Sequence, residues 1–540
     1  MKKVLSIIMV VILVLQVSCV KKPENKGNND DFKEVKISVY KASEILETIN
    51  KVNTYFQEKL TASSNNWDDA VYHSGNIRAY MYTGNLDFYN YSLEYAKRHH
   101  YLVNKGQNTV NGDLYCISQT YIDLYKLKQE DYILADVIRN ADFNADGRTD
   151  FGWIDLVYMS LPVFAELSEI TKDTKYIDDA YRAYKKARDI MWDEEASLFY
   201  RDARFVYDKN KSGTMTPSGK KILWSRGNGW AFAGLAKTLE VLDKNHESYK
   251  LYLKDFKAMA ESLKGRQRED GTWNANLDDP EHFGGIETSG TVMFMYGYAI
   301  GIKKGFLKYD EYFDTLKKAY DGVVKHAISD EGRLLYVQPV SDSPQNYQNY
   351  HDEEARKQST KQYAVGIFVM AACEIMSMCE DYEKPELVIP EDDYEPISQE
   401  DRAIDPNYYK GKIKVTATNQ QEGNEAEKLV DGVTEDKDGH RWSAPGFGSS
   451  ATLEFEEVLS IKKIVVVPYQ NRAYRYVIEK SMDGKDFEMV VDYRKNDKEW
   501  FFFSHDVDIE AKYIRIRVTG AYNYTGAWVS INEMLVYTKD

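Results

Sequence analysis

The sequence predicts an all-α domain built as an (α/α)6 toroid, followed by an all-β sandwich. From about residue 39 to residue 382, apolar residues recur at spacings of three and four, which is typical of helices; beyond residue 409 they alternate, which is typical of strands. A chain of 540 residues is also too long for one ordinary hydrophobic core and indicates several domains. The formal net charge of −16 argues against nucleic acid as a partner.

The first 18 residues are expected to be a signal peptide. A basic pair precedes an apolar run, residues 4–17, that is short for a membrane span. The sequence ending at Cys19 resembles a bacterial lipobox with that cysteine as the lipidated residue, although Gln16 stands where the pattern prefers Leu. A plain secretory signal is the alternative. We expect an exported bacterial lipoprotein, in the periplasm or at the cell surface or outer membrane, whose only membrane contact is this anchor and whose residues 19–38 form a polar tether.

About twelve helical segments are expected in the first domain, and their character alternates. Some, such as residues 176–192, are apolar on one face and charged on the other, whereas others, such as residues 289–302, are apolar nearly all round. An amphipathic helix covers an outside and an all-apolar helix must be enclosed, so six outer and inner pairs describe a toroid. An open helical solenoid is the alternative, but it would show a tighter sequence period. The segments lie near residues 42–60, 69–81, 86–104, 115–127, 131–141, 154–170, 175–192, 229–242, 247–264, 289–303, 309–326 and 362–379.

A linker and a β domain complete the chain after the helical domain, residues 39–382. Residues 383–408 are rich in proline, aspartate and glutamate and have no periodicity, which is typical of a linker. Residues 409–540 contain short alternating segments separated by turns, and this spacing predicts a sandwich. The expected strands are residues 412–417, 450–455, 461–467, 474–480, 487–493 and 513–518.

Two aspartates at the starts of inner helices are the candidate acid and base groups. Asp113 opens the fourth helical segment and Asp155 the sixth, both among apolar neighbours where a charge is costly. If both face one funnel, they form a carboxylate pair whose environments can separate their pKa values into acid and base roles. Each aspartate alone is equally well explained as a helix cap, and spacing does not show that the two face each other.

Residues 224–230 form the most distinctive motif, with two tryptophans and an arginine in one short stretch. Aromatic faces stack on sugar rings, and the guanidinium of Arg226 can hold a carboxylate with two hydrogen bonds, so the motif fits an anionic sugar. A buried helix start with both tryptophans in the core explains the same residues.

Residues 142–150 allow two interpretations. Asp, Asn, Asp and Gly occupy positions 1, 3, 5 and 6 of a calcium loop, but Trp153 stands at position 12, where such a loop needs Glu. A loop that contacts substrate is therefore favoured. No CxxC or HExxH spacing indicates zinc, and we expect no cofactor for catalysis.

Several motifs of the first domain occur in the same order as in a known enzyme family. The motifs are residues 67–75, Asp113 with residues 119–121, and residues 153–162, 224–230, 271–273, 287–291 and 336–339. They resemble glycoside hydrolase family 105, the unsaturated rhamnogalacturonyl hydrolases, and more distantly the unsaturated glucuronyl hydrolases of family 88. The (α/α)6 toroid is also the fold that this resemblance implies.

The resemblance implies roles for individual residues. Asp155 matches the family's general acid/base, and Asp113 matches its second carboxylate. Arg226 and Trp230 match a substrate-binding pair. Arg201 departs from the pattern, because some members carry His there, and we expect it to change the leaving-sugar side of the pocket. Other residues assigned to substrate binding are Trp153, Arg148, His73 and Asp69.

The implied reaction removes a 4,5-unsaturated uronic acid from the non-reducing end of an oligosaccharide that a polysaccharide lyase has produced, with rhamnogalacturonan as the favoured parent. Asp155 would protonate the vinyl ether double bond, and water would then add to it. Two other functions stay open: a glycan-binding lipoprotein with an inactive toroid, and an (α/α)6 glycosidase that acts on saturated glycosides. Galacturonyl and glucuronyl substrates differ in one hydroxyl, which pocket geometry decides.

A second set of motifs lies in the β domain, at residues 426–432, 441–443, 481–484, 513–516 and 530–534. They resemble a coagulation factor 5/8 type C, or discoidin, domain, a jelly-roll sandwich similar to carbohydrate-binding module family 32. The resemblance implies a bound glycan, with a purely structural role as the alternative. It also implies a structural Ca²⁺ held by Asp431 and Glu533, although the stretch 435–440 is longer than usual and leaves the remaining ligands unassigned.

Overall fold

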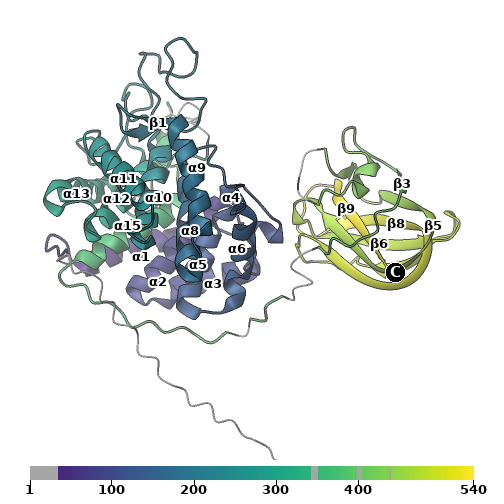
Figure 1. Cartoon of the computed structure of the whole chain (residues 1–540). Coiled ribbons are helices and arrows are strands. Elements are labelled where there is room, and N and C mark those ends of the chain that lie inside the picture. Colours follow the sequence, from purple (N-terminus) through teal and green to yellow (C-terminus); the bar gives the residue numbers. More distant parts are fainter. Residues whose placement is uncertain are drawn as a thin grey trace, which may run out of the picture. The chain divides into compact units, whose positions relative to one another are not determined.

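The computed structural model describes most of the chain from Val35 onward (Figure 1). The expected signal peptide, the lipidation site Cys19 and most of the expected tether lie outside the described residues. None of the described helices is long and apolar enough to cross a membrane. The described residues are 35–341, 351–392, 394–397, 404–434, 436 and 439–539.

Six helices of the described chain form a closed inner ring in the first domain. Each contacts the next, and the last returns to the first, so the ring closes. This closure confirms the expected toroid and excludes the open solenoid. The inner helices are α2 (Trp67–Thr83), α5 (Ser118–Lys128), α8 (Leu161–Thr171), α10 (Ser225–Val241), α12 (Thr288–Lys303) and α15 (Gln362–Met378).

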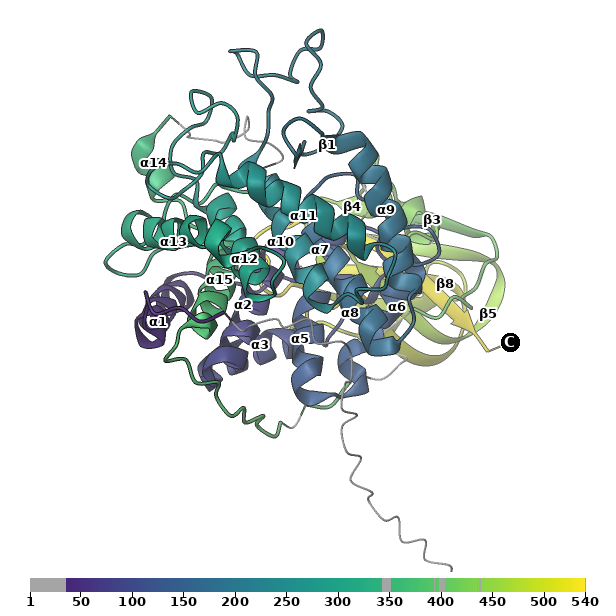
Figure 2. The same cartoon turned by 60° about the vertical axis from the view of Figure 1, so that its left-hand side comes forward.

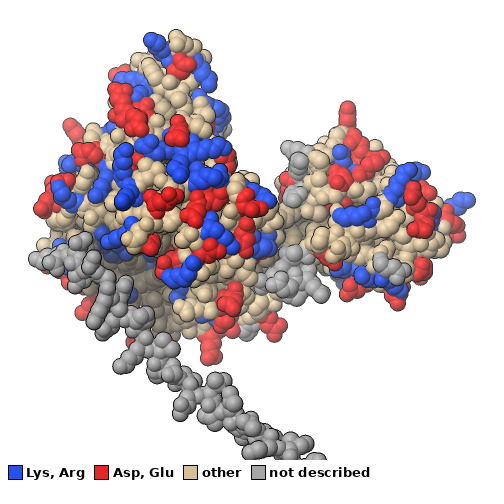
Figure 3. Space-filling model, in the orientation of Figure 1, with Lys and Arg blue, Asp and Glu red and all other residues tan. Residues whose placement is uncertain are grey.

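An outer helix packs against each inner helix, as Figure 2 shows. Helix α12 buries every residue except Lys303, whereas the outer α9 buries one face, with Tyr176 and Tyr184, and exposes charges on the other. Basic and acidic side chains are interspersed over the face of this domain shown in Figure 3. The outer helices are α1 (Ala42–Lys59), α3 (Leu86–Arg98), α6 (Asp131–Asn144), α9 (Lys175–Met191), α11 (Tyr249–Lys264) and α13 (Tyr309–His326).

Glycine lets two neighbouring inner helices approach each other closely. A Cβ atom added to Gly75 of α2 would lie 2.4 Å from the carbonyl oxygen of Gly366 in α15. A Cβ atom added to Gly366 would lie 2.5 Å from the Cα of Tyr72. Real Cβ contacts are longer than this, so the helix crossing requires the small residues that the sequence places there.

Short helices stand at the entrances of two inner helices. Helix α4 (Gly112–Tyr115) precedes α5, and α7 (Leu156–Met159) precedes α8. The chain therefore breaks what the periodicity suggested were continuous segments. The second break occurs at Ser160, because Pro162 has no amide hydrogen with which to continue the helix from α7.

Charged side chains from all six inner helices gather in their C-terminal halves. Arg78 pairs with Glu240 at 2.8 Å and with Glu374 at 2.9 Å, and Lys303 pairs with Glu374 at 2.7 Å. The side chain of Glu374 is 0% exposed, so these pairs lie in the interior, where an unpaired charge would be costly. A second group of charged side chains comes from α5, α8 and α10 and consists of Asp123, Lys126, Glu166 and Lys237.

The C-terminal domain is a seven-stranded antiparallel sheet folded around its own core. The strand order is β4-β9-β5-β8-β6-β7, and β3 pairs with β5. Trp442, Leu453 and Ile516 are among the fully buried core residues. The strands are β3 (Ile413–Ala417), β4 (Trp442–Ala444), β5 (Ser450–Pro468), β6 (Tyr474–Ser481), β7 (Glu488–Asp492), β8 (Phe503–Ala521) and β9 (Val529–Thr538).

Several of these strands differ from the sequence expectation. The short strand β4 was not expected, and β8 begins at Phe503 rather than at residue 513. Strand β5 is continuous through the two segments expected at residues 450–455 and 461–467, with a register shift between Glu454 and Leu459 that interrupts the alternation. Strand β9 was not expected, because nine of its ten residues are buried and it does not alternate. A strand buried on both faces has the pattern of a continuous core segment rather than of an amphipathic strand.

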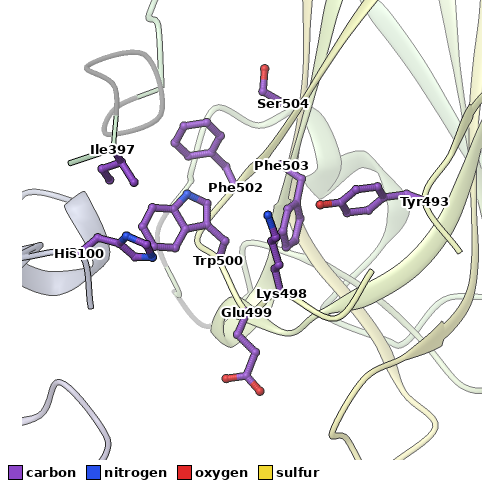
Figure 4. Close-up of a pocket in the computed structure, with 9 residues that line it drawn as sticks. All are labelled: His100, Ile397, Tyr493, Lys498, Glu499, Trp500, Phe502, Phe503 and Ser504. Carbon is purple, nitrogen blue, oxygen red and sulfur yellow. The ribbon is translucent and has the colours of Figure 1, made fainter. Parts of the chain in front are cut away.

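A pocket shown in Figure 4 is lined in part by aromatic residues of the β domain. Trp500 and Phe502 lie on one side of their segment, and Phe503 lies on the other, 5.3 Å from the ring of Tyr493. Glu499 is the one carboxylate among the described lining residues, so these residues offer no acid and base pair for hydrolysis.

Candidate active site

The structure brings the two expected carboxylates into one site at the mouth of the toroid. Asp113 lies in α4, where the side chain of Asn111 caps the helix by accepting a hydrogen bond from the Asp113 amide at 3.0 Å. Asp155 directly precedes α7 and makes no capping bond. The short helices α4 and α7 contact each other. The helix-cap explanation therefore accounts for neither aspartate, which leaves both side chains for chemistry.

The environment of this pair favours a bound proton. Burial, and after it the negative charge of Asp155, raise the pKa of Asp113 to about 7, against the opposing effect of the Arg201 guanidinium. Burial also raises the pKa of Asp155, against the positive charges of Arg201 and Arg226. Near neutral pH the site can therefore hold a proton on a carboxyl group, as a general acid requires.

Arg201 stands beside Asp155. Its Nε lies 3.7 Å from Oδ2 of Asp155, and neither atom has a hydrogen-bond partner among the described residues. A backbone bridge between Trp153 and Asp202 fixes this approach, together with the Ile154 amide, which donates to the Arg201 carbonyl oxygen at 2.9 Å. The guanidinium lies 5.4 Å from the ring centroid of Trp153. Arg201 and Trp153 thus form one wall next to the candidate acid.

The 224–230 motif is buried at the start of α10. Trp230 is 0% exposed and Arg226 is 1% exposed. Arg226 donates hydrogen bonds to the carbonyl oxygens of Gln338, Pro339 and Ser341 and to the hydroxyl of Tyr363, all between 2.7 and 3.0 Å. It therefore anchors the segment after Tyr336, and its charge acts on Asp155. The role of this motif in holding substrate stays a prediction.

Glu287 joins three parts of the site. Its carboxylate caps α12 by accepting from the amides of Ser289 at 2.9 Å and Gly290 at 2.8 Å. It also accepts from the hydroxyl of Ser225 at 2.9 Å and from the amide of Gln338 at 3.3 Å. One buried carboxylate thus fixes the starts of α10 and α12 and the segment that Arg226 holds. Glu287 lies in one of the motifs of the family resemblance, but no role was predicted for it from the sequence.

Asp68 is a third carboxylate near the pair, and no role was predicted for it from the sequence. Burial and the neighbouring charge of Asp69 raise its pKa, and its own charge raises that of Asp113. The side-chain amide of Gln362 donates to it at 2.8 Å. Consecutive helix residues point in different directions, so Asp68 and Asp69 cannot both face the same way. The sequence alone shows that at most one of the two can face the site, but it does not show which one.

Asp69 and His73 support the loop that leads into α2. Asp69 accepts hydrogen bonds from the amides of Ser63 at 2.9 Å and Ser64 at 2.8 Å. His73 is fully buried, with its Nε2 3.0 Å from the carbonyl oxygen of Ala62, and burial lowers its pKa to about 3. The ring is therefore neutral at physiological pH. The contacts of both residues indicate positioning of the loop, and direct contact with substrate stays a prediction.

Two acidic side chains of the loop at residues 142–150 form ion pairs with lysine side chains. Asp142 pairs with Lys175 at 3.0 Å, and Asp150 pairs with Lys186 at 2.8 Å. Arg148 pairs with Asp146 at 3.1 Å and donates to the Phe143 carbonyl at 2.7 Å, so its contacts stay within its own loop. Within the described residues, no group of three or more His, Cys, Asp and Glu side chains is arranged to hold a metal.

Asp431 and Glu533 face each other in the β domain. Burial, and after it the charge of Asp431, raise the pKa of Glu533 to about 9. Glu533 accepts from the amide of Gly432 at 3.1 Å, and Asp431 lies 3.0 Å from the Nδ1 of His440. Two adjacent carboxylates with this repulsion fit the oxygen donors that Ca²⁺ prefers, and its other ligands would have to be backbone carbonyls or water.

Comparisons with known proteins agree with this architecture. A family model described as Glycosyl Hydrolase Family 88 matches residues 42–379, and one described as F5/8 type C domain matches residues 414–534. A solved structure of a family 88 glycosyl hydrolase from Bacteroides vulgatus is 32% identical, with a TM-score of 0.58 over 63% of this chain and 100% of that one.

Two curated relatives carry the name unsaturated 3S-rhamnoglycuronyl hydrolase. The relative from Alteromonas sp. (strain LOR) is 31% identical over 224 residues, which are 42% of this chain and 51% of that protein. The relative from Formosa agariphila is 32% identical over 238 residues, which are 44% of this chain and 61% of that protein. The match thus spans less than two thirds of either relative.

Proposed function

We propose, from the premise that this chain belongs to Glycosyl Hydrolase Family 88, that its helical domain removes a 4,5-unsaturated uronic acid from the non-reducing end of lyase-generated oligosaccharides. One observation carries the proposal: Asp113 and Asp155 meet at one site, where burial raises the pKa of both. A vinyl ether is hydrated only after a carbon atom is protonated, and that step needs a carboxylic acid that is still protonated near neutral pH.

The proposed mechanism begins with proton transfer. Asp155 donates its proton to C4 of the unsaturated ring, and the electrons of the double bond form the new C–H bond. The positive charge that develops at C5 and the ring oxygen lies near the carboxylate of Asp113, which stabilises it. Water then adds at C5 and returns a proton to Asp155. The resulting hemiketal rearranges and expels the neighbouring sugar.

Arginine side chains would orient the substrate. The Arg201 guanidinium, which lies beside Asp155 and next to Trp153, would attract the carboxylate of the sugar. The names of the two curated relatives specify a rhamnoglycuronyl substrate. We propose that in the substrate of this chain, too, the unsaturated uronic acid is linked to rhamnose. Rhamnogalacturonan remains the favoured parent polysaccharide.

Loss of ultraviolet absorbance by the unsaturated ring tests the function. Lyase digests of rhamnogalacturonan, ulvan and glycosaminoglycans should include at least one substrate, and saturated oligosaccharides should not react. Asp155→Asn should abolish turnover. Asp173→Asn, which removes an exposed carboxylate paired with Lys175, is the matched control and should retain it. Near-normal turnover by Asp155→Asn, or equal turnover of saturated glycosides, would contradict the proposal.

For the β domain we propose glycan binding and one structural Ca²⁺. Asp431 and Glu533 would hold the ion, whose charge would remove the repulsion between them. Calcium should then raise the unfolding temperature of the full chain, and chelation should lower it. Glu533→Gln should remove this calcium dependence. An unfolding temperature that does not change with calcium would contradict the metal site.

We also propose that the protein is exported and anchored through Cys19. The support is the sequence of the first 19 residues, which lie outside the described structure. In a bacterial host, Cys19→Ala should move the protein from the membrane fraction to the soluble fraction. Recovery of the unaltered chain in the soluble fraction would contradict the anchor.

A further inference from the structure

We propose that an arginine–tyrosine surface on the loops of the β domain binds a glycan that carries carboxylate or sulfate groups. The arginine–tyrosine surface consists of Arg441, Tyr469, Arg472 and Tyr524. Its residues come from three separate loops: the one before β4, the one between β5 and β6, and the one between β8 and β9. This inference rests on the proposal that the β domain binds a glycan, and it specifies the surface and the chemistry of the ligand.

Guanidinium groups and aromatic rings alternate across this surface. The Cζ of Arg441 lies 4.2 Å from the ring centroid of Tyr469. The Cζ of Arg472 lies 5.3 Å from the same ring and 4.3 Å from the ring of Tyr524. Stacking on aromatic faces holds a guanidinium in a defined plane, which lowers the entropy lost when it binds a ligand.

Arg472 carries the charge that this ligand would meet. It makes no ion pair with any described residue, whereas Arg494 in the same domain pairs with Asp492 at 2.5 Å. Arg472 donates to the hydroxyl of Tyr474 at 3.1 Å and to the side-chain oxygen of Gln470 at 3.0 Å. A guanidinium has five N–H donors, so further donors remain for an anionic group.

Exposed aromatic side chains extend the surface. Tyr522 is 48% exposed and Trp528 is 42% exposed. The hydroxyl of Tyr474, which accepts from Arg472, donates to the carbonyl oxygen of Trp528 at 3.0 Å and so joins the two loops. Large apolar side chains are seldom left this exposed in a group unless they contact a ligand or partner.

The backbone of two of these loops is strained. Gln470 and Asn471 each have a φ of 55°, and Asn523 has a φ of 51°. Residues other than glycine adopt this left-handed conformation at an energetic cost, and such residues cluster at binding sites. The strain holds the loops in a fixed shape before a ligand arrives.

Together these features fit an anionic glycan. Exposed aromatic faces stack on the C–H surfaces of sugar rings, and stacked guanidinium groups bind carboxylate or sulfate with paired hydrogen bonds. A neutral glycan would need the aromatic faces but would gain nothing from the charge of Arg472. The planar carboxylate of a uronic acid and the tetrahedral sulfate of a sulfated sugar can each present two oxygens to the guanidinium.

Affinity electrophoresis of the full chain tests this inference. Gels would contain polygalacturonate, which supplies carboxylates, dextran sulfate, which supplies sulfates, or dextran, which is neutral. We expect at least one anionic polymer, but not dextran, to retard the protein. Arg472→Gln should weaken that affinity at least tenfold. Arg494→Gln, which makes the same charge change elsewhere in the domain, should alter it less than twofold.

Several outcomes would overturn the inference. The first is that neither anionic polymer retards the protein, and the second is that the two glutamine variants lose the same affinity. The third is that the protein binds phosphatidylserine vesicles in a sedimentation assay but neither polymer. If Arg472→Gln does not fold, Arg472→Lys tests the paired hydrogen bonds, and unchanged affinity there would also count against the inference. Hydrolysis of an unsaturated disaccharide by the unaltered chain is measured in parallel. Retardation without hydrolysis would refute only the proposed enzyme, and hydrolysis without retardation would refute only this surface.

Discussion

Arg201 holds its Nε 3.7 Å from Oδ2 of Asp155, in a position where burial and the positive charge act on the pKa of that carboxyl in opposite directions. Burial favours the protonated acid, and the guanidinium favours the carboxylate. The balance between these effects sets the pH range in which Asp155 can donate a proton.

Removal of this guanidinium should shift the pH dependence of the reaction. Arg201→Gln removes an effect that lowers the pKa of Asp155, the proposed acid, so this carboxyl should stay protonated to higher pH. The alkaline limb of the kcat/KM profile should then move to higher pH, which absorbance assays across buffers would measure. Arg201→Lys, which keeps the charge, should shift the limb less. A limb that stays in place in Arg201→Gln would contradict this account.

The raised pKa of Asp113 should also make the free energy of unfolding depend on pH. The ordinary pKa of 3.8 rises to about 7 in the folded protein, so between these values the folded state binds more protons than the unfolded state. Stability should therefore fall as pH rises through this window. Asp113→Asn should be more stable than the unaltered chain at pH 8 by about 1–2 kcal/mol, after allowance for solvent screening, and show no gain at pH 4. Urea unfolding at the two pH values measures the difference, and an equal difference at both would refute it.

The crossing of α2 and α15 should not tolerate a methyl group. Gly75→Ala would place a Cβ atom 2.4 Å from the carbonyl oxygen of Gly366, which forces the backbones apart. We expect a loss of about 3 kcal/mol or failure to fold. Gly152→Ala is the matched control, because its Cβ would meet no atom nearer than 3.8 Å, and it should change stability by less than about 0.5 kcal/mol. Similar unfolding midpoints for the two variants would contradict the close approach.

The interior ion pairs at the C-terminal halves of the inner helices should be costly to break. Arg78→Met would leave Glu240 and Glu374 short of a partner in the interior, and we expect a loss of about 3–5 kcal/mol in urea unfolding. Lys172→Met removes one member of an exposed pair with Glu169, so its effect should stay below about 1 kcal/mol. A small loss in Arg78→Met would show that its partners find other cations.

Much of the fold could be predicted from periodicity. The alternation between all-apolar segments such as residues 289–302 and amphipathic ones such as residues 176–192 anticipated the inner and outer helices, because burial on all sides and burial on one face leave different patterns. The breaks before α5 and α8 and the strands β4 and β9 were missed. Each depends on local backbone geometry or on burial of both strand faces, which the pattern of apolar residues does not record.

The candidate site was predicted as a set of residues but not as an arrangement. Asp113 and Asp155 were identified from apolar surroundings, whereas Asp68 and Glu287 were given no role. Arg226 was expected to hold a carboxylate, and the structure shows it bonded to backbone carbonyls after Tyr336. A sequence lists which groups are present, but the partner that each group finds depends on segments that are distant along the chain.

The sequence by itself determined the two domains, the helical ring, the family and the identity of the carboxylate pair, because these follow from periodicity and from motifs with fixed spacing. Only the tertiary structure decided that Asp155 faces Arg201, that Asp68 acts on Asp113, and that Arg472 lies between two tyrosine rings. Electrostatic effects and stacking depend on distances through space, and closure of the ring and folding of the sheet set those distances.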